Sequence, residues 1–84
     1  MSDEQPFTAP NRTPGPTEHL WAIRRGGRQF DCELLDHGTS GVEVRCLRDL
    51  EWFYGHRCES RELAMTEADE RKAQYLREGG VLIA

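Results

Sequence analysis

Residues 42–54 read VEVRCLRDLEWFY, an alternating run followed by a short polar break and three adjacent aromatic side chains. In the first half, apolar side chains recur at every second position, Val42, Val44 and Cys46, which is the period of a strand with one buried face. Asp49-Leu50 is short enough to be a two-residue hairpin loop, after which the chain returns as a second strand. This stretch therefore predicts the β-hairpin that decides the fold.

The register of this hairpin assigns its aromatic side chains to the two faces of the sheet. If the loop is Asp49-Leu50, Cys46 pairs with Phe53, and Phe53 lies in the core. Leu50 stands where such a turn prefers glycine, so a longer loop is the alternative, and it would shift the register by one residue and reverse the faces. With the two-residue loop, the side chains predicted on the outer face are Arg45, Leu47, Trp52 and Tyr54.

A second hairpin is predicted earlier in the chain, around Gly26-Gly27. Two adjacent glycines suit the type I′ turn, whose central residues both have positive φ. This turn pairs Ile23 with Phe30 and Trp21 with Cys32. The pairing gathers the apolar side chains Trp21, Ile23, Phe30, Cys32 and Leu34 on one face and leaves Leu20, Ala22, Asp31 and Glu33 on the other.

The C-terminal part of the chain changes to the period of a helix. We expect this helix to begin after Ser60 as N-cap and to end at Gly79-Gly80, with its apolar stripe covering one face of the sheet. The last residues, Val81-Leu82-Ile83-Ala84, are apolar, and we expect them to pack back on the domain or to pair with a sheet edge. The predicted stripe consists of Ala64, Met65, Ala68, Tyr75 and Leu76.

Length and composition place these elements in one small domain. All four prolines of the 84-residue chain fall within residues 1–18. That segment has little apolar surface to bury, so we predict a disordered tail over 1–18 and a single ββββα domain over 19–84. The predicted fold class is α+β, a four-stranded antiparallel sheet with one C-terminal helix packed on one face. A core of this size is marginal, which leaves a homodimer open.

The polar residues form no pattern typical of a catalytic or metal-binding site. Asp36, His37 and Ser40 have the residue types of a hydrolase triad, but one short loop cannot hold them in the geometry of a triad. Three cysteines and three histidines are present, yet zinc sites usually take two ligands from a close cysteine pair, and only His56-x-Cys58 is close. We therefore expect no enzyme, no cofactor, no metal and cysteines that stay thiols.

The outer sheet face and the helix are the candidate partner surfaces. One helix covers only one face of a sheet, and Trp, Tyr and Arg on the uncovered face are typical of interface hot spots. Acidic side chains in the first half of the helix, where the helix dipole also favours them, could meet a basic partner. The predicted partner-binding residues are Arg45, Leu47, Trp52, Tyr54, Glu62, Asp69 and Glu70.

A resemblance adds to this interpretation. The runs that carry it are Leu20-Trp21-Ala22-Ile23-Arg24-Arg25-Gly26-Gly27-Arg28, Cys32-Glu33-Leu34, Gly41-Val42-Glu43-Val44, Leu47-Arg48-Asp49, Phe53-Tyr54-Gly55-His56-Arg57 and 64–70. Over most of residues 19–80 they resemble a group of short proteobacterial proteins without a described function, some encoded near prophage genes. This resemblance implies a β-sheet-plus-helix fold and no catalytic residue, and Leu50 departs from it. In size, acidity and architecture the chain is also similar to phage anti-CRISPR proteins, which block a CRISPR effector complex by direct binding.

Two functions from different classes follow from these patterns. The first is a non-catalytic protein-binding module, most concretely an anti-CRISPR-like inhibitor that docks on a basic, nucleic-acid-binding complex in the bacterial cytoplasm. The alternative is a small nucleic-acid-binding domain that uses sheet arginines and aromatics. The formal charge of −4 disfavours the alternative. No stretch has the pattern of a signal peptide or of a membrane span, so we expect no membrane partner.

Overall fold

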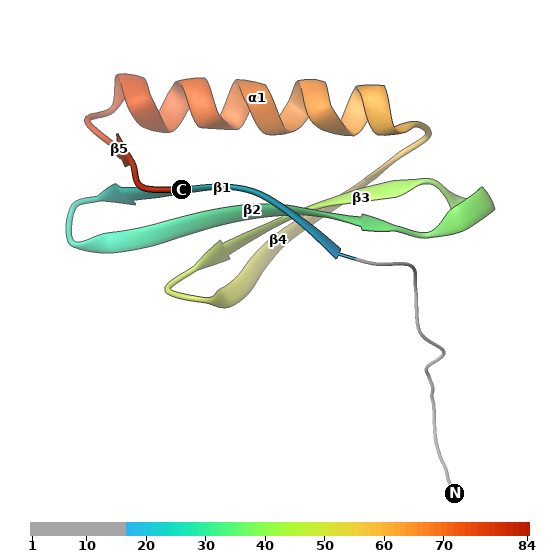
Figure 1. The fold of residues 1–84 in the computed structure, drawn as a ribbon, viewed down its shortest axis with the longest axis horizontal. Coiled ribbons are helices and arrows are strands. Elements are labelled where there is room, and N and C mark those ends of the chain that lie inside the picture. The colour runs from blue at the N-terminus through green and yellow to red at the C-terminus, as the bar shows by residue number, and fades with distance from the viewer. Residues whose placement is uncertain (1–16) are drawn as a thin grey trace, which may run out of the picture.

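The computed structural model describes residues 17–84, which form one antiparallel sheet in the order β4-β3-β2-β1-β5 with an α-helix across one face (Figure 1). The predicted tail over 1–18 lies outside the described residues as far as residue 16, whereas Thr17 and Glu18 belong to the first strand. The elements are β1 (Thr17–Arg25), β2 (Arg28–Asp36), the 3-10 turn η1 (Gly38–Ser40), β3 (Val42–Arg48), β4 (Glu51–Cys58), α1 (Arg61–Arg77) and β5 (Val81–Leu82).

The β1–β2 hairpin has the predicted turn, and the predicted register is confirmed from Arg25 to Trp21. A bulge follows at Leu20, whose side chain packs against the core, so its predicted place on the opposite face is wrong. Gly26 and Gly27 both have positive φ, 59° and 79°, as a type I′ turn requires. Ile23 pairs with Phe30 and Trp21 with Cys32. The predicted apolar face, which includes Trp21, Ile23 and Cys32, is buried under α1, and we call this side of the sheet the helix face and the opposite side the outer face.

The β3–β4 turn is the predicted two-residue loop, even though it lacks glycine. Asp49 and Leu50 have φ values of 52° and 70°, and Arg48 pairs with Glu51. Asp49 holds the loop against β2, because its carboxylate accepts hydrogen bonds from the backbone N–H of Gln29 and from Arg28, each at 3.0 Å. These contacts offset the cost of placing a leucine in a left-handed conformation.

A β-bulge in β4 corrects the predicted positions of two aromatic residues. Leu47 pairs with Trp52, but Cys46 pairs with Tyr54, so Phe53 is an extra residue in the ladder. Tyr54 therefore lies on the helix face, and its predicted place on the outer face is wrong. Phe53, predicted to pair with Cys46 in the core, is 46% exposed, although its ring meets Phe30 edge-on at 6.4 Å.

The helix packs on the sheet through its smallest side chains. Ala64 and Ala68 are fully buried, which brings α1 close enough for the Trp21 indole to donate a hydrogen bond to the Ala68 carbonyl at 3.2 Å. The predicted N-cap is confirmed, since the Ser60 hydroxyl accepts from the Leu63 N–H at 3.2 Å. Leu76, expected in the buried stripe, is instead 38% exposed.

The C-terminal residues add a fifth strand, which corrects the predicted four-stranded sheet. Val81–Leu82 pairs with Arg24 and Ile23 of β1, and the backbones of Ile83 and Ala84 continue the contact by hydrogen bonds with Ala22 of 2.9 and 3.0 Å. From the sequence, edge pairing and packing on the domain were both left open for these residues, because a two-residue strand is too short to show an alternating pattern. With β5 in place, β4 is the long edge strand of the sheet in the described part of the chain.

The core is small and contains two thiols side by side. Cys32 and Cys46 pair directly across β2 and β3, and both side chains are inaccessible to solvent. Neither of the two forms a disulfide in this structure. The hydrogen bond with Cys46, followed by burial, raises the pKa of the Cys32 thiol far above its ordinary range, so the Cys32 sulfur stays protonated and packs as a hydrophobe.

Candidate functional site

The outer face carries one exposed aromatic side chain that is held in place. Trp52 is 59% exposed, and its indole N–H donates to the Tyr54 carbonyl at 2.6 Å. The guanidinium of Arg45 lies 4.9 Å from the centre of its ring. Gly55 makes room for the indole, because a Cβ there would lie 3.0 Å from Trp52 Cζ2. The Trp52 side chain is thus held in one orientation against β4 by contacts within the chain.

Apolar side chains also gather at the end of the β3–β4 hairpin. Leu50 in the turn is 72% exposed, and Phe53 projects toward the helix face of the same edge strand. We call Leu50, Trp52 and Phe53 the hairpin tip. Because Trp52 and Phe53 lie on opposite faces of β4, the tip offers apolar surface on both sides of a sheet edge.

Two carboxylates of the outer face are held by neighbouring side chains. Asp31 is buried, and its carboxylate is held by His19 and Gln29, each at 2.8 Å. Glu43 lies between His37 at 2.8 Å and Arg45 at 3.6 Å. The outer face therefore presents Asp31 and Glu43 as carboxylates already engaged by other side chains.

A second group of polar side chains lies between α1 and β4. The Tyr54 hydroxyl donates to Glu67 Oε2 at 2.7 Å, and Arg71 Nε lies 3.5 Å from the same oxygen. The other oxygen, Oε1, lies 2.5 Å from His56 Nδ1 and 3.9 Å from Cys58 Sγ. We call Tyr54, His56, Cys58, Glu67 and Arg71 the Glu67 cluster.

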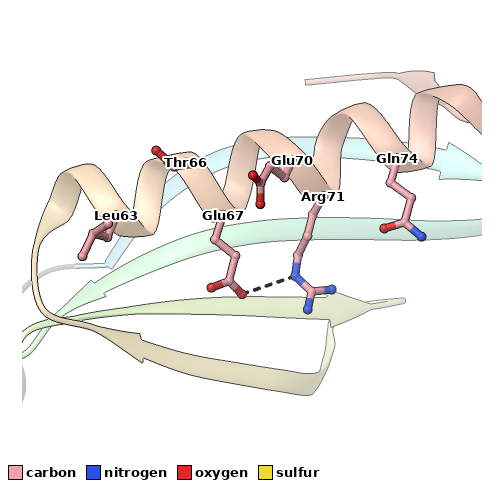
Figure 2. Close-up of a pocket in the computed structure, with 6 residues that line it drawn as sticks. All are labelled: Leu63, Thr66, Glu67, Glu70, Arg71 and Gln74. Carbon is pink, nitrogen blue, oxygen red and sulfur yellow. Dashed lines mark ion pairs between the residues drawn. The ribbon is translucent and has the colours of Figure 1, made fainter.

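Figure 2 shows Glu67 and Arg71 projecting side by side from α1 toward the β3–β4 hairpin. They form part of a shallow open pocket of about 400 Å³ on this side of the helix. The Arg71 guanidinium also stacks on the Tyr54 ring, 3.8 Å from its centre. The pocket is lined by Leu63, Thr66, Glu67, Glu70, Arg71 and Gln74.

The protonation states in the Glu67 cluster follow from its contacts. Partial burial opposes ionisation of Glu67, but hydrogen bonds with His56 and Tyr54 and the charge of Arg71 outweigh it, so the pKa of Glu67 is lowered. Burial, followed by the charge of Glu67, raises the pKa of the Cys58 thiol. At neutral pH the cluster therefore contains a carboxylate and a protonated thiol.

The predicted partner-binding residues do not form one surface. Arg45, Leu47 and Trp52 share the outer face, as predicted. Tyr54 lies on the helix face, where its hydroxyl donates to Glu67 and the Arg71 guanidinium stacks on its ring. The acidic residues Glu62, Asp69 and Glu70 are exposed on α1, on the other side of the sheet from Trp52, and Glu70 lines the pocket.

The Glu67 cluster is a group that the sequence interpretation missed. His56-x-Cys58 was visible as a close pair, but the third donor comes from a helix that begins after it. The signal that could have found Glu67 is its place in the helix, one turn before Arg71 and three residues after the buried Ala64.

The chain is thus a small α+β domain with two candidate sites, the hairpin tip at the end of β3–β4 and the Glu67 cluster between α1 and β4. No protein-family model, curated protein or solved structure matches the chain. Within residues 17–84, α1 is too short and too polar to cross a bilayer.

Proposed function

We propose that this protein is a non-catalytic protein-binding module whose partner docks on the hairpin tip and the adjoining edge of β4. The observation that carries this proposal is the Trp52 side chain, which is 59% exposed and yet held in place. Its indole N–H makes a hydrogen bond, the Arg45 guanidinium stacks on its ring, and Gly55 has no Cβ to displace it. Fixed aromatic side chains next to arginine contribute a large share of binding energy at protein interfaces, because little conformational entropy is lost when they are buried.

The edge position of β4 supports the same proposal. Backbone donors and acceptors along a sheet edge can pair with an extended segment of another protein, and side chains on the two faces then give specificity. Trp52 and Phe53 lie on opposite faces of this edge, so a partner strand placed beside β4 would be contacted on both sides.

The anti-CRISPR-like inhibitor is a narrower form of this proposal. Its support is the resemblance in size and acidity, and the exposed acids Glu62, Asp69 and Glu70 on α1. Because these acids and Trp52 lie on different sides of the sheet, one flat partner surface does not contact both sets at once. We therefore propose that the partner docks on the hairpin tip, and that the acidic residues of α1 act at longer range by attracting a basic partner during association.

A nucleic-acid-binding role is less well supported by the same contacts. Arg28 is paired with Asp49, Arg25 with Glu78, and Arg45 lies between Trp52 and Glu43. Arginines engaged in this way would have to leave a carboxylate before they could bind a phosphate. The formal charge of −4 opposes binding further.

The test is affinity capture from a bacterial lysate with three baits: the wild-type chain, the Trp52→Ser variant and a Leu63→Ser control. Leu63 is also an exposed apolar residue, at 55%, but it lies on α1 away from the tip. We expect a protein that the wild type and the control retain after nuclease treatment and that Trp52→Ser loses. Capture that nuclease abolishes would support the nucleic-acid alternative, and capture that survives Trp52→Ser would place the site elsewhere.

A further inference from the structure

The Glu67 cluster brings together three metal-binding side chains of different chemical types. His56 Nδ1 lies 3.8 Å from Cys58 Sγ, Glu67 Oε1 lies 3.9 Å from the same sulfur, and the nitrogen and oxygen are 2.5 Å apart. All three atoms fall within 4.8 Å of one another. We propose that these side chains bind a divalent transition-metal ion of the zinc class, with water as the fourth ligand.

The separations suit a tetrahedral ion after one small movement. Metal–ligand bonds of about 2.0–2.3 Å place tetrahedral ligand atoms roughly 3.3–3.7 Å from one another. The two distances to sulfur are already close to this range. The nitrogen–oxygen pair is shorter because it is hydrogen-bonded, and it must open by about 1 Å. The His56 side chain is 56% exposed and free to make this movement.

The carboxylate is oriented for this role by its other contacts. Tyr54 and Arg71 both engage Oε2 of Glu67, which leaves Oε1 directed at His56 and Cys58. Outer contacts of this kind fix the orientation of metal ligands and account for a substantial part of their affinity. The metal takes the place of the proton between Nδ1 and Oε1, so the neutral imidazole of His56 carries its proton on Nε2. The thiol proton of Cys58 leaves to solvent when the sulfur binds.

The charges near the site affect how strongly the metal ion binds. Arg71 is a cation 3.5 Å from the outer oxygen of Glu67 and opposes a dication. The Glu67 carboxylate and the Cys58 thiolate together neutralise a divalent ion, so the repulsion from Arg71 weakens binding without preventing it. A sulfur and an imidazole among the donors select zinc or cobalt over magnesium or calcium, which prefer oxygen.

The position of the site suggests what the ion does. His56 and Cys58 belong to the edge strand β4, whereas Glu67 belongs to α1. A bound ion would therefore link the helix to the outermost strand of the sheet. Because it binds only the folded chain, it raises the apparent stability by RT ln(1 + c/Kd), where c is the concentration of the free ion, so the gain grows with the logarithm of that concentration. The inference does not depend on the hairpin tip, since no ligand of the site is a tip residue.

Cobalt provides the most direct test, because a cysteine thiolate bound to Co²⁺ gives a charge-transfer absorption band that carboxylate and imidazole alone do not. Untagged, chelator-treated protein is titrated with Co²⁺ under reducing conditions and then with Zn²⁺. We expect one equivalent of Co²⁺ to produce the band, Zn²⁺ to abolish it, and Zn²⁺ to raise the thermal midpoint. Failure of saturating Co²⁺ to produce the band would overturn the proposal.

Matched variants separate this site from adventitious binding. His56→Ala leaves the core untouched and should weaken Co²⁺ binding at least about tenfold, and Tyr54→Phe should weaken it by a similar factor through Glu67. His37→Ala is the control, since His37 also lies 2.8 Å from a carboxylate but has no thiol beside it. A band that persists unchanged in His56→Ala, or that is lost equally in His37→Ala, would show that the ion binds elsewhere.

Discussion

Trp52 and Tyr54 are two residues apart in the same strand, yet their side chains lie on opposite faces of the sheet. In a regular strand such residues share a face, but Phe53 is an extra residue in the ladder and turns Tyr54 toward α1. The bulge thereby leaves Trp52 on the surface and brings Tyr54 to Glu67. The bulge at Phe53 thus places Trp52 in the hairpin tip and Tyr54 in the Glu67 cluster.

The stability of the fold should depend little on Trp52. Because this side chain is 59% exposed, Trp52→Ser should change the free energy of unfolding by less than about 1 kcal/mol, measured by urea denaturation. The same variant should lose the captured partner. Unfolding of Trp52→Ser at room temperature would mean that the indole belongs to the core, and it would remove the basis for the tip as a docking surface.

Tyr54 and Glu67 should be energetically coupled. Tyr54→Phe removes the donor of the 2.7 Å hydrogen bond and Glu67→Ala removes its acceptor. In chelator-treated protein, Tyr54→Phe should cost about 1 kcal/mol of unfolding free energy. In the Glu67→Ala background, the same Tyr54→Phe change should cost much less, because the acceptor of the hydrogen bond is already gone. Strictly additive losses from the two single variants would contradict the contact.

The two tyrosines should resist ionisation while the chain is folded. Burial raises the pKa of both Tyr54 and Tyr75, the only tyrosines in the sequence. The neutral phenols therefore stabilise the fold fully below about pH 10, the ordinary value for tyrosine. This stability is lost as the pH rises through the folded-state pKa values.

The measurement is phenolate absorbance followed together with circular dichroism. We expect the phenolate signal to appear above pH ~10 and to coincide with unfolding. Tyr54→Phe isolates Tyr75 in the same titration. Full ionisation at or below pH ~10 in a chain that keeps its circular dichroism would show that these side chains are solvated.

The core thiols should tolerate loss of sulfur better than gain of a hydroxyl. Cys32→Ser or Cys46→Ser buries an oxygen among apolar side chains and should lower the unfolding free energy by roughly 1–3 kcal/mol. Cys32→Ala is the comparison and should cost less than serine at the same position. Chelator should not change these differences, because neither residue is near enough to ligate at the Glu67 cluster. A serine variant as stable as the wild type would contradict the packing.

Charge reversal on the helix distinguishes steering from docking. Replacing Glu62, Asp69 and Glu70 by lysine should preserve the helix, since all three are exposed, and should slow association with a basic partner more than it speeds dissociation. Association of the wild type should slow as salt is raised. If the triple variant lost binding altogether while Trp52→Ser kept it, the partner would dock on α1.

The sequence predicted those elements whose signals are local. Gly26-Gly27 specifies a turn and hence a register, and Ser60 and Gly79 mark the ends of α1, so these features are as expected. The bulge at Phe53 has no such local mark, because it depends on how β4 fits against β3 and α1 together. The faces of Tyr54 and Phe53 therefore could not be assigned from alternation alone.

The candidate site was predictable to a similar extent. Trp52 was placed on the outer face from the two-residue loop, and this is confirmed because its pairing with Leu47 lies between the loop and the bulge. His56 and Cys58 were recognised as the only close pair of ligand type. Glu67 joins them through tertiary packing of the helix, which no spacing along the chain records.

The two edges of the sheet are unequal, and this limits how the protein can assemble. Within residues 17–84, β5 and the backbones of Ile83 and Ala84 pair with Ala22, Ile23 and Arg24 of β1, whereas no strand pairs with the outer side of β4. A second copy that adds its own β4 antiparallel to this edge uses the same surface on both sides of the contact. Such a pair covers both β4 edges, so the domain can pair through β4 without polymerising into a fibre.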